Sequence, residues 1–167
     1  MEIITGRLRI IPFTIEIIQS AMNQDGRRLV EMGIIPTDEW PEAVLLEALP
    51  YFNQQLLEYG VTGYNSWLIL DRWTGAIIGS IGFINEPDES GCVEIGFGIL
   101  PSKRRNGYCE EAARVLIDWA AAQNKVRMIT AQCHPNNEPS MRLLTKLGFQ
   151  MTACDPSLAS WKRIIQK

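Results

Sequence analysis

A short basic loop between an apolar stretch and an amphipathic stretch constrains this chain more than any other feature. Residues 93–100 have the composition of a buried strand, and residues 112–123 have the spacing of a helix packed on a sheet. The loop between them, residues 101–111, carries three consecutive cations and a glycine. The first N–H groups of a helix lack intrahelical acceptors, and a preceding glycine allows close approach. We therefore expect an anion site suited to phosphate or pyrophosphate. The alternative is a basic loop that only caps the helix.

The strand before this loop has two unlike faces, because side chains alternate along a strand. One face holds Val93, Ile95, Phe97 and Ile99, and the other holds Glu94, Gly96 and Gly98. Glycine weakens a strand interior, so two glycines on one face indicate that something approaches that face closely. A ligand and the side chain of another element are both consistent with the pattern. Glu94 is the only carboxylate on the glycine face.

The remaining patterns predict an α+β protein. We expect strands at residues 7–13, 66–70, 76–84, 92–100, 127–133, 149–154 and 160–165. We expect helices from Thr14, over about 41–59 with a kink or break at Pro50, over 112–123 and over 140–147. Residues 27–39 show no clear element. At 167 residues the chain is expected to form a single domain over residues 1–167.

Charge and cysteine content narrow the function classes. The net charge of -3 argues against nucleic acid as the main partner. The four cysteines and single histidine show no metal-ligand spacing, so we expect no metal site and free thiols. The N-terminus lacks the order of a signal peptide, and no apolar run is long enough to span a bilayer. We therefore expect a cytoplasmic protein with no membrane partner.

Three motifs in order resemble those of GNAT-superfamily N-acetyltransferases, and more narrowly the branch of ribosomal-protein N-terminal (alanine/serine) acetyltransferases. The signature of Arg or Gln, two residues, Gly, one residue, then Gly or Ala matches residues 104–109, and its Gly-Tyr extension matches 107–112. Val-Glu-Ile-Gly-Phe stands at 93–97, and Asn-Glu-Pro-Ser at 137–140 precedes Lys-Leu-Gly-Phe at 146–149. The resemblance covers nearly the whole chain. It implies the GNAT fold, with a mixed, mostly antiparallel sheet of about seven strands and helices on both faces.

The resemblance also implies acetyl-CoA as cofactor, held between the strands that end near Leu100 and Cys133. The residues implied in cofactor binding are Phe97, Gly98, Ile99, Leu100, Arg104, Arg105, Asn106, Gly107, Tyr108, Cys109 and Asn137. We expect the backbone N–H groups of residues 105–109 to hold the pyrophosphate and the strand N–H groups near Phe97 to polarise the thioester carbonyl. Cys109 departs from the family's Gly or Ala. The Tyr108 side chain is expected to pack.

The catalytic candidates are Glu94 and Ser140. Glu94 is the candidate base, directly or through water, the alternative being an ion pair or a solvated strand residue. His134 is a second candidate base or simply exposed. Ser140 is the candidate for contacting the departing sulfur, or it bonds the backbone of its own helix. Leu144 stands where many relatives have a Tyr as general acid.

The implied reaction is direct attack of a primary amine on acetyl-CoA in a ternary complex. We expect the acceptor to be a protein N-terminal α-amino group. The alternatives are a small-molecule acceptor such as an aminoglycoside, polyamine or amino acid, or an acyl-CoA-binding module without catalysis. Residues 27–40 and 154–160 are expected to wall the acceptor pocket. The oligomeric state is expected to be monomer or homodimer.

Overall fold

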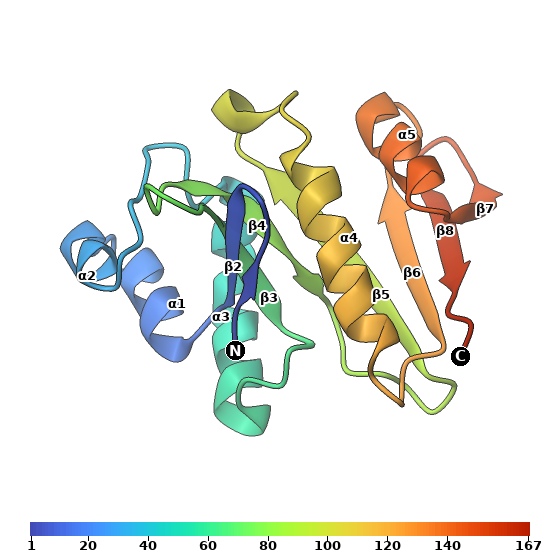
Figure 1. Ribbon diagram of the computed structural model, residues 1–167, viewed down its shortest axis with the longest axis horizontal. Coiled ribbons are helices and arrows are strands. Elements are labelled where there is room, and N and C mark those ends of the chain that lie inside the picture. Colours follow the sequence, from blue (N-terminus) through green and yellow to red (C-terminus); the bar gives the residue numbers. More distant parts are fainter.

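The computed structural model describes all residues from 1 to 167 and contains one eight-stranded sheet of order β1-β2-β3-β4-β5-β6-β8-β7 (Figure 1). The strands are β1 (Ile3–Ile4), β2 (Leu8–Pro12), β3 (Ser66–Asp71), β4 (Ile77–Phe83), β5 (Cys92–Ile99), β6 (Met128–Cys133), β7 (Gln150–Cys154) and β8 (Ala159–Ile164). The helices are α1 (Ile15–Met22), α2 (Gly26–Glu31), α3 (Ala43–Tyr59), α4 (Tyr108–Ala121) and α5 (Glu138–Lys146), and a 3₁₀ turn spans Pro101–Lys103. Every pairing is antiparallel except that of β5 with β6.

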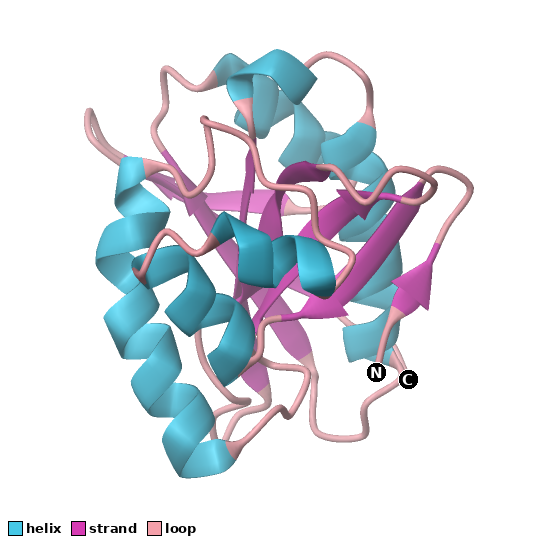
Figure 2. Cartoon of the chain, turned by 90° about the vertical axis from the view of Figure 1, so that its left-hand side faces the viewer, coloured by secondary structure: helices cyan, strands magenta, loops and turns pink.

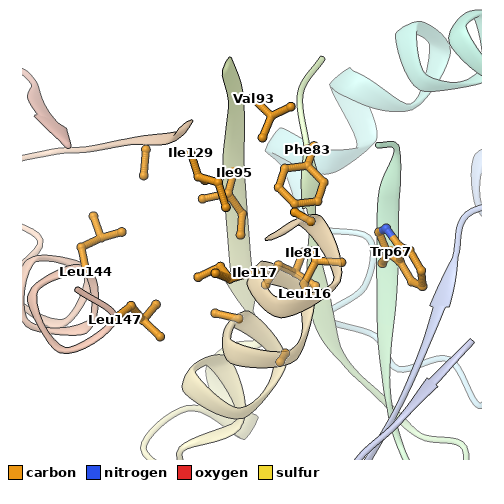
Figure 3. Close-up of a cluster of buried hydrophobic side chains, with 14 of the residues drawn as sticks. Trp67, Ile81, Phe83, Val93, Ile95, Leu116, Ile117, Ile129, Leu144 and Leu147 are labelled. Atoms are coloured by element: carbon orange, nitrogen blue, oxygen red, sulfur yellow. The ribbon is translucent and has the colours of Figure 1, made fainter. Parts of the chain in front are cut away.

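Helices cover both faces of the sheet, as the view in Figure 2 shows. Alternate strand residues point to opposite faces, so Trp67 and Ile69 join one core and Leu68 and Leu70 join the other. The larger core packs α4 and α5 against β2 to β6 and β8, and Figure 3 shows its centre. The smaller core packs α1, α2 and α3 against β3 and β4. None of the helices has the length and apolar composition needed to cross a bilayer.

The fold class is as expected, and three details differ from the sequence-based prediction. The sheet has eight strands because the two residues of β1 add an edge strand, and a short α2 lies in the stretch that showed no clear element. Pro50 lies inside α3 and does not divide it, since the helix is continuous from Ala43 to Tyr59. Burial of Leu49 and Leu56 against the sheet holds the turns on either side of the proline.

The sheet opens between β5 and β6. These parallel strands pair over three residues only, and the last pair is Glu94 with Thr130. From Ile95 to Ile99, β5 pairs with β4 alone, and β6 runs on to Cys133 paired with β8 alone. Two free backbone edges therefore face each other, and Figure 1 shows the strands diverging toward their carboxyl ends. The basic loop follows β5 at that end, and α5 follows β6.

Candidate active site

The free edge of β5 offers backbone groups at alternate residues. Leu100 donates its N–H to the carbonyl of Ile78, and the carbonyl of Glu94 accepts from the residue after β4. Backbone groups alternate between the two sides of a strand, so these even-numbered residues face β4. The N–H and C=O groups of Phe97 and Ile99 consequently face the gap. They are the donors that could polarise a carbonyl placed there.

Arg104 covers the end of this edge. Its Nε donates to the carbonyl of Ile99 at 3.0 Å, and its terminal nitrogens have no partner within the protein. Gly98 and Leu100 were predicted as contact residues together with Phe97 and Ile99. The backbone groups of Gly98 and Leu100 face β4, so neither residue can form a backbone hydrogen bond in the gap. Gly98 contributes only free space there.

Glycines on the open face of β5 differ from those of β4. A Cβ on Gly79 would lie 2.2 Å from the carbonyl oxygen of Gly98, and one on Gly82 would lie 2.5 Å from the Cα of Ser66. Packing against backbone therefore requires both β4 glycines. A Cβ on Gly96 or Gly98 would meet only side-chain atoms, at 4.0 and 3.9 Å, which is ordinary contact. Packing within the protein therefore does not require glycine at Gly96 or Gly98.

The loop after β5 presents a run of free backbone donors. The N–H groups of residues 105–110 have no acceptor within the protein. Arg105 and Gly107 both have left-handed backbone, with φ of 64° and 76°, which turns successive N–H groups toward one side. Asn106 stabilises this shape by donating from its side-chain amide to two carbonyl groups of the same loop, at 3.0 and 3.1 Å. The arrangement is suited to an oxyanion such as a diphosphate.

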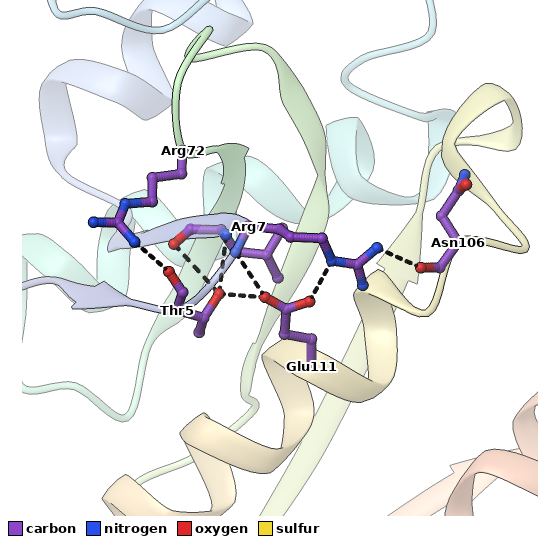
Figure 4. A network of polar contacts seen from close by, with 6 residues as sticks. Thr5, Arg7, Arg72, Asn106 and Glu111 are labelled. Atoms are coloured by element: carbon purple, nitrogen blue, oxygen red, sulfur yellow. Dashed lines mark hydrogen bonds and ion pairs between the residues drawn. The ribbon is translucent and has the colours of Figure 1, made fainter.

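Arg7 contacts the basic loop, which the sequence did not reveal. Figure 4 shows its side chain between Glu111 and the loop. Its Nε donates to Oε2 of Glu111 at 2.7 Å and its Nη1 to the carbonyl of Asn106 at 2.8 Å. The guanidinium lies 4.6 Å from the centre of the Tyr108 ring. A fourth cation therefore lies beside the loop, contributed from a position far away in the sequence.

Three side chains at the start of α4 are fixed by their surroundings. Burial tends to raise the pKa of Glu111, but hydrogen bonds from Thr5 and Arg7 outweigh it and hold that pKa below its ordinary value. Hydrogen bonds from Lys146 and Arg114 lower the pKa of Glu110. Burial raises the pKa of the Cys109 thiol to about 12, so Cys109 is a small neutral packing residue.

On the other side of the gap, the first turn of α5 presents Ser140. Asn137, which the resemblance implies in cofactor binding, caps this helix by accepting from the Ser140 N–H at 3.2 Å. The Ser140 hydroxyl has no partner within the protein, so the alternative of a backbone bond is not realised. Leu144 is 1% exposed and packs in the larger core. His134 is exposed, and its Nδ1 accepts from the N–H of Asn136.

Glu94 lies at the base of the gap, at the last residue where β5 pairs with β6. Its side chain is half-buried and makes no ion pair or hydrogen bond, so the predicted alternative of a salt bridge is not found. On the expected acceptor side, Glu39 is bound to the basic loop, where its carboxylate accepts from the N–H and hydroxyl of Ser102. Trp40 is buried, whereas Asp38 is exposed.

Comparison with known proteins agrees with this geometry. A mixed sheet opens between two parallel strands, and free backbone donors suited to an oxyanion follow one of them. Residues 7–150 match the acetyltransferase (GNAT) domain, so the chain belongs to the GNAT family of N-acetyltransferases, enzymes that use acetyl-CoA. The chain is 39% identical over 158 residues to an uncharacterized N-acetyltransferase, YjdG, of Bacillus subtilis strain 168, and the aligned residues make up 94% of each chain.

Solved structures share the fold. A GNAT-family acetyltransferase from Bacillus anthracis superposes with a TM-score of 0.69 at 21% identity over 100% of both chains. The ribosomal L7/L12 α-N-protein acetyltransferase RimL, in complex with coenzyme A, gives a TM-score of 0.73 at 17% identity over 99% of this chain and 98% of that one. At these identities the likeness extends to the fold, and the resemblance to GNAT acetyltransferases predicted from the motifs is confirmed.

Proposed function

We propose that this protein transfers the acetyl group of acetyl-CoA to a primary amine and that the acceptor is the α-amino group of a protein N-terminus. The observation that supports it most is the gap between β5 and β6, with a glycine face open to it and the free N–H groups of residues 105–110 at its end. A gap flanked in this way fits a long ligand that carries a diphosphate at one end and a carbonyl at the other.

The residues present fit coenzyme A. The N–H groups of residues 105–110 would bind the diphosphate, with Arg7 and Arg104 as neighbouring cations. The free edge at Phe97 and Ile99 would bind the amide groups of the arm and the thioester carbonyl. When bound, acetyl-CoA supplies the activated acetyl group. Much of the rate gain would come from holding the two reactants together, worth several kcal/mol.

Two side chains have proposed roles in proton transfer. Glu94 would accept the proton of the amine through water, because about 10 Å of strand separates its Cα from that of Phe97. Ser140 would donate a hydrogen bond to the departing sulfur, since its hydroxyl has no other partner. Leu144 lies in the core and offers no proton, so this chain does not use the side chain that many relatives have at that place.

The modest base supports a protein N-terminus as the acceptor. An α-amino group has a pKa of about 8 and a lysine side chain one of about 10.4, so about a tenth of N-termini is neutral at pH 7, against fewer than about one lysine in a thousand. A base that acts through water is sufficient for an α-amino group and too weak for a lysine side chain. RimL, which has this fold, is described as an α-N-protein acetyltransferase.

Acetyl-CoA turnover, followed as free thiol, tests the proposal against a panel of acceptors. The panel contains hexapeptides beginning with Ala or Ser, the same peptides already N-acetylated, spermidine and an aminoglycoside. We expect turnover with the free peptides and none with the blocked ones. Preference for spermidine or the aminoglycoside would assign a small-molecule acceptor instead. Binding of acetyl-CoA without turnover on any amine would contradict the enzymatic proposal.

A further inference from the structure

A second carboxylate, that of Glu42, lies over the glycine face of β5. Glu42 immediately precedes α3, yet its side chain makes no capping bond to that helix. Its Oε1 is 3.9 Å from the position that a Cβ on Gly98 would occupy. Its Oε2 is buried and has no hydrogen-bond partner within the protein, and no cation forms an ion pair with it. The protein therefore places a carboxylate at the gap without using it for folding.

The segment that carries Glu42 holds two more unused polar groups. The indole Nε1 of Trp40 and the hydroxyl of Thr37 are also buried without partners, and the Trp40 side chain is only 6% exposed. Three of the five such atoms in the protein thus lie within six residues. Buried polar groups are nearly always hydrogen-bonded, to protein, ordered water or a ligand, so this segment has hydrogen-bonding groups that the rest of the chain does not use. Of the three, Glu42 is the group that lies over the glycine face.

The position of Glu42 relative to the thioester distinguishes it from Glu94. Gly98 lies between Phe97 and Ile99, whose N–H groups face the gap and are proposed to bind the thioester carbonyl. Four residues of strand, about 13 Å between Cα atoms, separate Glu94 from Gly98. Glu42 is therefore the carboxylate next to the carbon that the amine must reach.

We propose that Glu42 binds the ammonium group of the acceptor over Gly98, which selects acceptors that carry an aliphatic amine and positions the nitrogen beside the thioester. This inference rests on the proposed function and deepens it. A carboxylate with no cation of its own attracts a cationic ligand, and a charge-assisted hydrogen bond fixes the direction of the ammonium group. Before attack, the ammonium group gives one proton through water to Glu94, and the neutral nitrogen then attacks the thioester carbon. As the C–N bond forms the C–S bond breaks, and the second proton of the nitrogen passes to the departing thiolate. Glu42 is thus a binding residue and Glu94 the base.

The test compares Glu42→Gln with wild type and with Glu47→Gln, which changes an exposed carboxylate on the same helix. The probes are an Ala-initiated hexapeptide, spermidine and acetyl-CoA. We expect Glu42→Gln to raise KM for the amine about tenfold or more, the effect of losing one charge-assisted hydrogen bond. We expect kcat and the Kd of acetyl-CoA from calorimetry to change little. Tm should stay the same or rise, because no protein group loses a partner. Glu47→Gln should match wild type throughout.

Other outcomes would overturn the inference in recognisable ways. A clearly lower Tm of Glu42→Gln would show that the carboxylate has a structural partner. A fall in kcat at unchanged KM would make Glu42 the base, and weaker acetyl-CoA binding would make it a cofactor residue. If wild type turns over neither amine, calorimetry with spermidine and the coenzyme A-saturated protein separates the two proposals. Binding lost in Glu42→Gln would retain the inference and reject the catalytic proposal, whereas equal binding or none would reject the inference.

Discussion

Glu111 is the residue that fixes the N-terminal segment to the start of α4. It accepts from the Thr5 hydroxyl, from the backbone N–H of Arg7 and from the Arg7 guanidinium, and its side chain is 21% exposed. Through Arg7 it also orients the carbonyl of Asn106 in the basic loop (Figure 4). Its ionised form is therefore a condition for the shape of the candidate phosphate site.

Glu111→Gln should lower the free energy of unfolding by about 1–3 kcal/mol at pH 7, the value of hydrogen bonds to a charged group. Its pKa is lowered in the folded protein, so the stabilisation is fully present above the ordinary glutamate pKa of about 4.3. It is lost as the pH falls through the folded pKa. Urea unfolding at pH 7 and pH 3 measures the loss of unfolding free energy in Glu111→Gln and its dependence on pH. The control is Glu89→Gln, which changes an exposed and unpaired glutamate. If the unfolding free energy of Glu111→Gln differs from that of the wild type as much at pH 3 as at pH 7, the assignment is contradicted.

Glu94→Gln tests the proposed base. We expect kcat to fall about a hundredfold or more near pH 7, which is typical for removing a general base. The KM for the amine should stay within about threefold, since Glu94 acts through water. Steady-state kinetics of the wild type and the variant between pH 6 and 9 measure both constants. If the variant keeps the wild-type kcat between pH 6 and 9, Glu94 is not the base.

Among the elements, β5 was the most readable from sequence and carries the most consequence. Its alternation predicted the apolar and glycine faces correctly, because strand periodicity is a local property. The basic loop was also a local pattern. By contrast, β1 and α2 are too short to give a periodic signal. Pro50 was expected to kink the helix or divide it into two, and the division is not found because packing holds the helix continuous.

Alanine at two glycines separates function from packing. Gly98→Ala should leave the free energy of unfolding within about 1 kcal/mol of wild type, because its Cβ meets only ordinary contacts. It should nevertheless lower kcat/KM about tenfold or more, since the methyl group occupies the space beside the thioester. Gly79→Ala should destabilise by about 1–3 kcal/mol, because its Cβ would lie 2.2 Å from a backbone oxygen. Urea unfolding and steady-state kinetics measure both, and equal loss of stability in the two variants would contradict the distinction.

For the whole molecule, the gap is produced by topology rather than by any one motif. The single parallel pairing lies inside an otherwise antiparallel sheet, and the two strands separate after three residues. Contacts that cross the fold were not predictable from local patterns. Arg7 contacts a loop residue 99 positions away in the sequence. Glu42, in the segment just before α3, lies over the face of Gly98 on β5. Such pairs depend on how layers stack, which residue spacing does not encode.

The main-chain donors of residues 105–110 are proposed to bind the diphosphate of coenzyme A, and the other proposed roles at the gap depend on this contact. Isothermal titration calorimetry of the wild-type protein with coenzyme A and with pantetheine, which lacks the diphosphate and nucleotide, tests this most directly. We expect pantetheine to bind about a hundredfold more weakly, equivalent to losing two charge-assisted hydrogen bonds. No heat with coenzyme A, or equal affinity for the two compounds, would contradict the account.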